Sequence, residues 1–301
     1  LAKEKQYIST LEDLIMYSKG YRLIRDRNQP GMPRQYSIVG KTGETITSLS
    51  GTADIVKYDF GYEIDPVWEA GNKNIPGIYI EFKEPWLNPK GFEQIVYDVL
   101  ANTQDMNIIE KPEPEDTPFY INNGTINVGN TNGKVILQTF SLESLVRVAE
   151  VFQGKVPMCF LLWKGTGATD LTYDDPLGYA SFINLGVKYK AHFIGPCIAG
   201  APNDYPELDQ PWQDYLIHRA KMKNHPYTFD TYDQMAKYFG QYNFGVADGM
   251  FNPPYLDALF TNHSDMSINY MITHGWRKSP ASQTLVDARE VLRKLGYLDN
   301  N

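Results

Sequence analysis

The stretch Gly77-Ile-Tyr-Ile-Glu-Phe-Lys83 is rich in β-branched and aromatic residues and predicts a β-strand. A helix is predicted next over residues 91–103, where apolar residues recur at helical spacing, and a second strand over residues 135–140. Further strands are predicted at residues 158–163, 191–197, 226–229 and 248–251, and further helices at residues 141–152, 211–221, 231–239 and 282–295. Nearly unbroken apolar strands that alternate with helices are typical of a parallel sheet covered by helices, either doubly wound or closed into a (β/α)8 barrel.

Polar side chains near the carboxyl ends of the strands favour the barrel. They belong to Glu81, Lys83, Gln138, Lys164, His192 and Thr228. In a barrel such side chains converge on one face, whereas a doubly wound sheet usually has a glycine-rich first turn. No G-x-G-x-x-G or phosphate-binding loop motif occurs in the sequence. We therefore predict an α/β fold of the (β/α)8 TIM-barrel type, with six of the eight strands recognisable in this chain.

Residues 1–301 are predicted to form a single barrel-type domain. A short amphipathic helix is predicted to begin after Thr10. Residues 21–70 are polar and punctuated by glycine and proline, which indicates an insertion, with an exposed hairpin around residues 41–43. Residues 256–301 are expected to form a C-terminal loop and a closing helix.

The charge and composition exclude several classes of protein. The sequence has 28 Lys and Arg against 36 Asp and Glu, a formal charge of -8, so a nucleic-acid or anionic-membrane surface is not expected. No window approaches about 18 consecutive apolar residues, so no membrane span is expected. The two cysteines, Cys159 and Cys197, are too far apart for a C-x-x-C motif. They are expected to be buried apolar residues, and could pair only if the fold brings them together.

Glu81 and Lys83 are the first candidates for chemistry. Alternation along a strand places both side chains on one face, with Ile80 and Phe82 on the other. A carboxylate beside an ammonium group at a barrel mouth could hold a divalent cation and a phosphate. The same two residues could also form an ion pair that only satisfies two partly buried charges, and the spacing alone leaves both interpretations open.

Five sequence motifs follow one another within about residues 75–255. They are Ile78-Tyr-Ile-Glu-Phe-Lys-Glu-Pro-Trp86, Lys134-Val-Ile-Leu-Gln-Thr-Phe140 with Leu142-Glu-Ser-Leu145, Phe193-Ile-Gly-Pro196, His225-Pro-Tyr-Thr228 and Val246-Ala-Asp-Gly-Met-Phe251. Together they resemble the glycerophosphodiester phosphodiesterase family, especially its larger secreted or periplasmic branch. The first motif is similar to the family's Tyr-x-Glu-Ile-Lys-x-Pro strand, so the resemblance implies that Glu81 binds a metal and that Lys83 is catalytic.

The chain also departs from this family. The family's front end is missing: a strand ending in His-Arg-Gly, a strand with a Glu-x-Asp metal pair, and a hairpin with His-Asp. In the family that segment supplies the acid, the base and two of three carboxylate ligands. Where the family has Phe-Thr-Asp-Phe-Pro, this chain has Phe251-Asn-Pro-Pro254. The chain begins at Leu1, and we expect that an N-terminal segment was removed, left unsequenced, or remains as a separate chain.

The resemblance implies hydrolysis of a glycerophosphodiester to glycerol 3-phosphate and an alcohol. A divalent cation, Ca²⁺ or Mg²⁺, would bridge the substrate phosphate and carboxylates that include Glu81, and Lys83 would neutralise phosphate oxygens. The resemblance also implies secretion, to the periplasm or the extracellular space. Sequons at Asn123 and Asn262 would accept glycans if the source is a eukaryotic secretory protein.

Other residues are candidates for the barrel mouth. His225 could reach the substrate as a catalytic residue or bond a backbone carbonyl, and Gln138 could bind near the phosphate or have only a structural role. Tyr227 and Trp163 could form an apolar wall against the alcohol, although aromatic residues in barrels are more often core residues. His192 is expected in the core. Three further histidines are expected at the surface, namely His218, His263 and His274.

A second class of function competes with the phosphodiesterase. The chain could be a secreted, barrel-derived binding or structural protein that has lost the catalytic front segment and hydrolyses nothing. A six-strand remnant would leave two exposed sheet edges, which favours a phosphodiesterase with a missing segment over a functional fragment. A Rossmann-type binding protein is a third hypothesis, and the absent glycine-rich turn opposes it.

Overall fold

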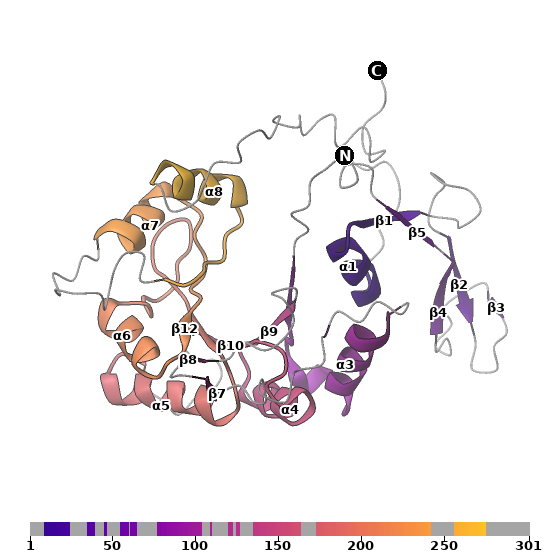
Figure 1. The fold of residues 1–301 in the computed structure, drawn as a ribbon, viewed down its shortest axis with the longest axis horizontal. Coiled ribbons are helices and arrows are strands. Elements are labelled where there is room, and N and C mark those ends of the chain that lie inside the picture. The colour runs from indigo at the N-terminus through magenta and orange to yellow at the C-terminus, as the bar shows by residue number, and fades with distance from the viewer. Residues whose placement is uncertain are drawn as a thin grey trace, which may run out of the picture. The chain divides into compact units, whose positions relative to one another are not determined.

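The computed structural model describes twelve parts of the 301-residue chain (Figure 1). They are residues 9–24, 35–39, 45–46, 55–59, 61–64, 77–103, 109, 120–122, 125–126, 135–163, 173–241 and 256–274. The chain divides into two compact units, one of residues 1–78 with 282–301 and the other of residues 79–281. The single barrel-type domain expected over the whole chain stays a prediction.

The larger unit is built on a five-stranded, all-parallel sheet in the order β12-β11-β10-β9-β6. The strands are β6 (Ile78–Glu81), β9 (Val135–Thr139), β10 (Met158–Leu162), β11 (Phe193–Pro196) and β12 (Lys223–Asn224). The central strand β10 pairs Met158 with Leu137 and Cys159 with Phe193, and it is buried along its whole length. Such burial is typical of a parallel sheet covered on both faces. The predicted α/β fold with a parallel sheet is confirmed, and its closure into a barrel stays a prediction.

Helices alternate with these strands and cover one side of the sheet (Figure 1). They are α3 (Phe92–Asn102), α4 (Leu142–Phe152), α5 (Pro176–Lys188) and α6 (Pro211–Arg219), and the short 3-10 helix η1 (Pro85–Leu87) precedes α3. Ser141 and Asp175 begin α4 and α5 because their side chains accept hydrogen bonds from backbone amides of the first turn. Phe160 of β10 stacks on Phe182 of α5 with ring centroids 4.3 Å apart. Aromatic packing of this kind buries one face of the sheet beneath the helices.

The opposite face of the sheet carries a second apolar cluster, centred on Cys159, Leu161 and Phe193. Gly195 of β11 lies in the middle of it: a Cβ at this position would be 2.6 Å from Leu161 Cδ2 and 2.9 Å from Cys159 Sγ. A side chain at this position would clash, so glycine in β11 leaves room for the side chains of Leu161 and Cys159 on the neighbouring strand β10. Cys159 and Cys197 are both buried, as predicted, and the structure shows them unpaired, which the sequence leaves open. Burial raises the pKa of each thiol to about 12.

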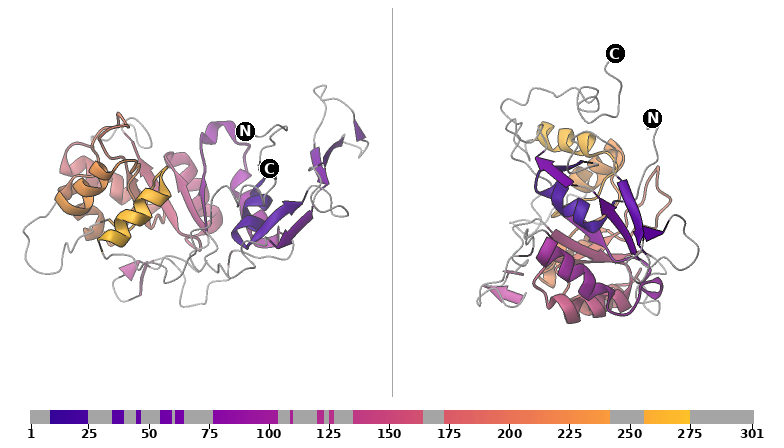
Figure 2. Two further views of the ribbon diagram at one scale, coloured as in Figure 1. Left: turned by 90° about the horizontal axis from the view of Figure 1, so that it is seen from above. Right: turned by 90° about the vertical axis from the view of Figure 1, so that its right-hand side faces the viewer.

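Residues 232–241 and 264–273 of the larger unit are helical. They form α7 (Tyr232–Ala236), the π-helical turn η4 (Lys237–Gln241) and α8 (Ser264–Thr273). Figure 2 shows α8, in yellow, beside α7, and the Asn269 amide donates to the Tyr232 hydroxyl at 3.3 Å between the two helices. Phe229, Tyr238 and Tyr270 form the buried core that these helices share.

One extended segment, residues 256–262, runs beside the chain that follows β12; we call it the strap. The backbone amide of Asp257 donates to the Asn224 carbonyl at 3.0 Å, and the amide of Phe260 donates to the Pro226 carbonyl at 3.0 Å. The hydrogen bonds advance in the same direction along both segments, so the strap runs parallel to the chain that follows β12, although the two do not form a regular ladder.

The described residues of the smaller unit form one helix and two antiparallel sheets. The helix α1 (Leu11–Ser18) begins with a capping box of Thr10 and Asp13, as the sequence predicts. In one sheet β1 (Tyr21–Ile24) pairs with β5 (Gly61–Ile64); in the other β2 (Gln35–Val39) pairs with both β3 (Thr45–Ile46) and β4 (Ile55–Asp59). The β2–β3 pair confirms the predicted hairpin around residues 41–43. A further antiparallel pair, β7 (Tyr120–Asn122) with β8 (Thr125–Ile126), belongs to the larger unit.

Several predicted elements differ from the structure. The strand predicted at residues 226–229 is wrong: β12 ends at Asn224, and beyond it Tyr227 forms only an isolated bridge with Cys197. The backbone amides of His225 and Tyr227 still donate to the Ile194 and Pro196 carbonyls, so hydrogen bonding to β11 continues past Asn224, but residues 225–229 do not form a continuous strand. Two helices were not predicted from the sequence, α5 and α8.

Two predicted elements, the strand at residues 248–251 and the helix at residues 282–295, lie outside the described residues. Within the described ranges, no helix is long and apolar enough to cross a bilayer.

Candidate functional site

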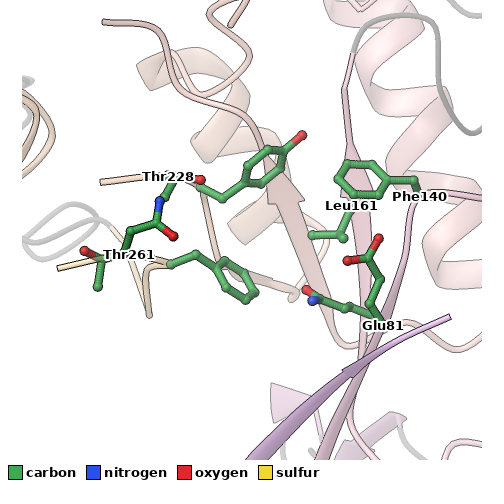
Figure 3. Close-up of a pocket in the computed structure, with 9 residues that line it drawn as sticks. Glu81, Phe140, Leu161, Thr228 and Thr261 are labelled. Atoms are coloured by element: carbon green, nitrogen blue, oxygen red, sulfur yellow. The ribbon is translucent and has the colours of Figure 1, made fainter. Parts of the chain in front are cut away.

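A cavity of about 250 Å³ lies at the carboxyl ends of β6, β9 and β10 in the larger unit (Figure 3). Parallel α/β sheets place their ligands at this end of the strands. The cavity is lined by Glu81, Gln138, Phe140, Leu161, Tyr227, Thr228, Phe260, Thr261 and Asn262. The fold thus brings together three predicted site residues that are far apart in the sequence, Glu81, Gln138 and Tyr227.

Glu81 and Gln138 lie on neighbouring strands. The amide of Phe82 donates to the Gln138 carbonyl at 2.8 Å, so β6 and β9 are paired where the two side chains enter the cavity. The Oε1 atoms of Glu81 and Gln138 are shielded from solvent and have no hydrogen-bond partner within the described part of the chain. An unpaired buried polar group costs about 1–3 kcal/mol. Two such oxygens on neighbouring residues that line one cavity indicate a site for a cation or a hydrogen-bond donor.

The apolar wall of the cavity is aromatic. Phe140 and Tyr227 pack edge to face with ring centroids 5.7 Å apart, and Phe260 belongs to the same cluster. The Tyr227 hydroxyl donates to the Leu162 carbonyl at 3.0 Å, and burial raises the pKa of this phenol far above its ordinary value. Tyr227 is therefore a fixed wall of the cavity and not a proton donor.

Figure 3 shows Thr228 and the strap residue Thr261 across the cavity from Glu81. Asn262 of the strap also lines the cavity. Asn262 is fixed by Asp230: its backbone amide donates to Oδ1 at 2.9 Å and its side-chain amide donates to Oδ2 at 3.1 Å. Sequence reasoning missed the strap because it assigned these residues to a C-terminal loop. The only available signal was a polar Thr-Asn pair directly after Phe260.

Lys83 and Trp163 are not among the described residues that line the cavity. β6 ends at Glu81 and Lys83 is exposed, so the strand alternation used to place Glu81 and Lys83 side by side stops before it reaches the lysine. Trp163 is 44% exposed and packs edge to face on Tyr205, which in turn packs on Tyr227. Trp163 is thus one aromatic ring removed from the cavity wall.

His225 is buried next to the cavity but is not among the described residues that line it. Its ring stacks on Phe193 with centroids 4.0 Å apart, and its Nδ1 lies 3.1 Å from the Tyr79 hydroxyl. Burial lowers the pKa of His225 to about 4, so the imidazole is neutral at pH 7. A buried, neutral imidazole in this environment is better suited to position Tyr79 than to exchange protons with solvent.

His218, predicted at the surface, is instead held between two carboxylates. Its Nδ1 lies 3.1 Å from Asp214 Oδ2 and its Nε2 lies 2.7 Å from Asp257 Oδ2. The surface prediction was wrong because it considered α6 alone. The helix places Asp214 one turn before His218, but Asp257 reaches the other side of the imidazole only through the folding of the strap. The predictions for the other histidines are confirmed, since His192 is fully buried and His263 and His274 are exposed.

The donor chemistry of the cavity fits a divalent cation in part. Ca²⁺ and Mg²⁺ prefer carboxylate and amide oxygens, which Glu81 and Gln138 provide. Among the described residues, no group of three His, Cys, Asp or Glu side chains could hold a metal ion. A cation here would complete its coordination with water, with substrate oxygens or with residues outside the described ranges.

Comparison with known proteins gives no matching family model and no matching curated protein.

Proposed function

We propose that this chain is part of a metal-dependent phosphodiesterase that hydrolyses glycerophosphodiesters to glycerol 3-phosphate and an alcohol. One observation carries the proposal: Glu81 and Gln138 line one cavity at the carboxyl ends of adjacent parallel strands, and each has a buried oxygen without a hydrogen-bond partner among the described residues. The order of the five sequence motifs supports the same reaction class. The proposed architecture is a (β/α)8 barrel, of which the described sheet supplies five strands.

In this proposal, Glu81 and Gln138 hold the charged end of the substrate. Glu81 would bind a Ca²⁺ or Mg²⁺ ion, which as a Lewis acid would stabilise the negative charge on the phosphate. Gln138 would offer its amide group to the phosphate or to the ion. Lys83 would neutralise the phosphate oxygens, for which its exposed side chain must reach the cavity rim from the end of β6.

The aromatic residues would receive the alcohol. Tyr227 would form the inner wall, and Trp163 would extend it through Tyr205 toward solvent. His225, proposed from the sequence as a catalytic residue, fits a positioning role better, because its neutral ring is buried against Phe193 and Tyr79.

The acid and base would come from a further N-terminal segment of the same protein. The family resemblance places both groups in that segment, and β6 is an edge strand among the described strands. A parallel strand added at this edge would bring its own carboxyl end next to Glu81. We further propose that the protein is extracellular or periplasmic, as in the larger branch of the family.

The test measures hydrolysis and metal binding on the same samples. We expect the full protein to release choline from glycerophosphocholine, and chelation or Glu81→Gln to abolish this release and to weaken calcium binding measured by calorimetry. Glu84→Gln is the matched control, because Glu84 is an exposed carboxylate three residues along the chain. Activity that survives both chelation and Glu81→Gln would overturn the metal role.

A second candidate is a binding protein that recognises the same phosphodiesters without cleaving them. It is favoured by one observation, the absence of a three-residue metal cluster among the described residues. Calorimetric binding of glycerophosphocholine without any choline release would select this candidate. Loss of that binding in Glu81→Gln, but not in Glu84→Gln, would place it in the same cavity.

A further inference from the structure

The strap supplies three of the residues that line the cavity, Phe260, Thr261 and Asn262. It is attached to the rest of the larger unit at both ends. At one end Asp230 accepts two hydrogen bonds from Asn262. At the other end Asp257 is the centre of a set of polar contacts that none of the proposed chemistry uses.

Asp257 binds three partners from two elements. Its Oδ2 accepts from the Asn224 backbone amide at 2.8 Å and lies 2.7 Å from His218 Nε2, and its Oδ1 accepts from Lys223 Nζ at 2.9 Å. The other ring nitrogen of His218 is bonded to Asp214 of the same helix. His218 therefore joins the strap to α6 through one imidazole; we call His218, Asp214 and Asp257 the clasp.

We propose that His218 is a positioning residue: in its protonated form the clasp holds the strap against β12, and thereby fixes the cavity wall opposite Glu81. The proposal deepens the proposed function, on which its kinetic consequences rest. A protonated imidazole can donate through both nitrogens at once, whereas a neutral one donates through only one. Charge-assisted hydrogen bonds are also about twice as strong as neutral ones. When His218 loses its proton, one of its hydrogen bonds to Asp214 and Asp257 is lost and the other becomes weaker.

The charges around the clasp favour the protonated form at neutral pH. Burial alone would lower the pKa of His218, but the hydrogen bonds to Asp214 and Asp257 outweigh it and raise the pKa to about 9. Two further charged groups lie close by: Asp209 accepts a hydrogen bond from the same Asn224 side-chain amide as Asp214, and Lys223 donates to the other oxygen of Asp257. Burial raises the pKa of Asp214, and it raises that of Asp209 well above its ordinary value. Burial would raise the pKa of Asp257, but its bonds to His218, the Asn224 amide and Lys223 lower it to about 2.

The strap should therefore be firmly held at neutral pH and should loosen as the pH passes 9, where His218 loses its proton. It should also loosen in acid as Asp214, whose pKa is raised by burial, takes up a proton. Phe260 is the residue through which loosening reaches the cavity, because its amide bonds the Pro226 carbonyl at 3.0 Å and its side chain belongs to the aromatic wall.

The first test measures hydrogen exchange of the full chain at pH 7. We expect His218→Gln to speed amide exchange across residues 257–262 by about 10-fold, while β9 and β10 keep their protection. Asp257→Asn should speed exchange in the same residues. If both variants keep the protection of β9 and β10, the faster exchange in the strap is a local effect and not a failure to fold. The matched control is His263→Gln, an exposed histidine next to the strap, which should leave exchange unchanged. Equal exchange in all four proteins would overturn the clasp.

The second test measures kinetics with glycerophosphocholine. We expect His218→Gln to raise KM by about 10-fold with kcat within about 2-fold, and to remove an alkaline limb near pH 9 from the profile of kcat/KM. His218→Lys keeps a cation in the clasp, so it should restore KM in part and shift that limb to higher pH. An unchanged KM and pH profile would refute the link to the cavity. If the wild-type protein hydrolyses nothing, the proposed function fails. The hydrogen-exchange experiment still tests whether the clasp holds the strap, because it does not depend on activity.

Discussion

The cavity and the clasp are both polar regions of the larger unit, and they differ in how their polar atoms are paired. Of the residues that line the cavity, Glu81 and Gln138 each have a buried Oε1 atom with no partner among the residues that the structure describes. In the clasp, both nitrogens of His218 and both oxygens of Asp257 are bonded. Both regions join segments that are distant in the sequence, so sequence separation does not explain why polar atoms are paired in one region and unpaired in the other.

The paired charges of the clasp are expected to stabilise the fold, whereas the unpaired oxygens of Glu81 and Gln138 are expected to destabilise it. A paired charge in a partly buried site contributes to stability, whereas an unpaired buried oxygen costs free energy that folding alone does not recover. Proteins retain such costs mainly where a ligand recovers them. Substitutions in the two regions should therefore change the free energy of unfolding in opposite directions.

The largest effect is expected in the clasp, from Asp214→Ala. Asp214 is fully buried and accepts from both His218 and the Asn224 side chain, so its removal leaves a charged imidazole and a buried amide short of a partner. We expect the free energy of unfolding to fall by about 3–5 kcal/mol in urea titrations at pH 6. Asp214→Asn, which keeps an acceptor oxygen, should lose less than half as much. A loss below about 1 kcal/mol for Asp214→Ala would contradict the pairing that defines the clasp.

A smaller effect should appear in the pH dependence of stability. The pKa of His218 is raised from its ordinary 6.5 to about 9, so its contribution is complete below pH 6.5 and disappears as the pH rises through 9. The side chain is 29% exposed, so solvent screening reduces this contribution to about 1–2 kcal/mol.

The measurement is the difference in free energy of unfolding between wild type and His218→Gln, taken from pH 6 to 10. Subtraction removes the titration of groups that both proteins share. The difference should shrink toward zero above pH 9, and a difference that stays constant over this range would contradict a charged His218.

The smallest effect, of opposite sign, is expected in the cavity. Glu81→Leu replaces an unpartnered buried oxygen by an apolar group of similar size, so the free energy of unfolding should rise by about 1 kcal/mol. The same variant should lose calcium binding. Thermal unfolding with and without calcium measures both, because only a protein that binds the ion gains stability from it. A destabilised Glu81→Leu would show that the carboxylate already has a partner.

Local patterns in the sequence predicted the parts of this fold that depend on neighbouring residues. Apolar spacing located α3, α4 and α6, and a Thr-x-x-Asp capping box located the start of α1. α5 was missed because Gly178 and Gly186 weaken its helical pattern; Gly186 is kept small by Ile194 and Met222, whose side chains a Cβ would approach within 3.2 and 3.3 Å. That constraint comes from packing and leaves no periodic signal in the sequence.

The sequence by itself determined that strands and helices alternate and that Glu81 and Gln138 stand near strand ends. It did so because hydrophobic periodicity and strand alternation are properties of a few adjacent residues. Only the tertiary structure decided which polar residues meet. The strap brings Asp257 to His218, and Thr261 and Asn262 to the cavity, through backbone hydrogen bonds between segments more than thirty residues apart. Pairing of this kind depends on the folded backbone, and no local pattern encodes it.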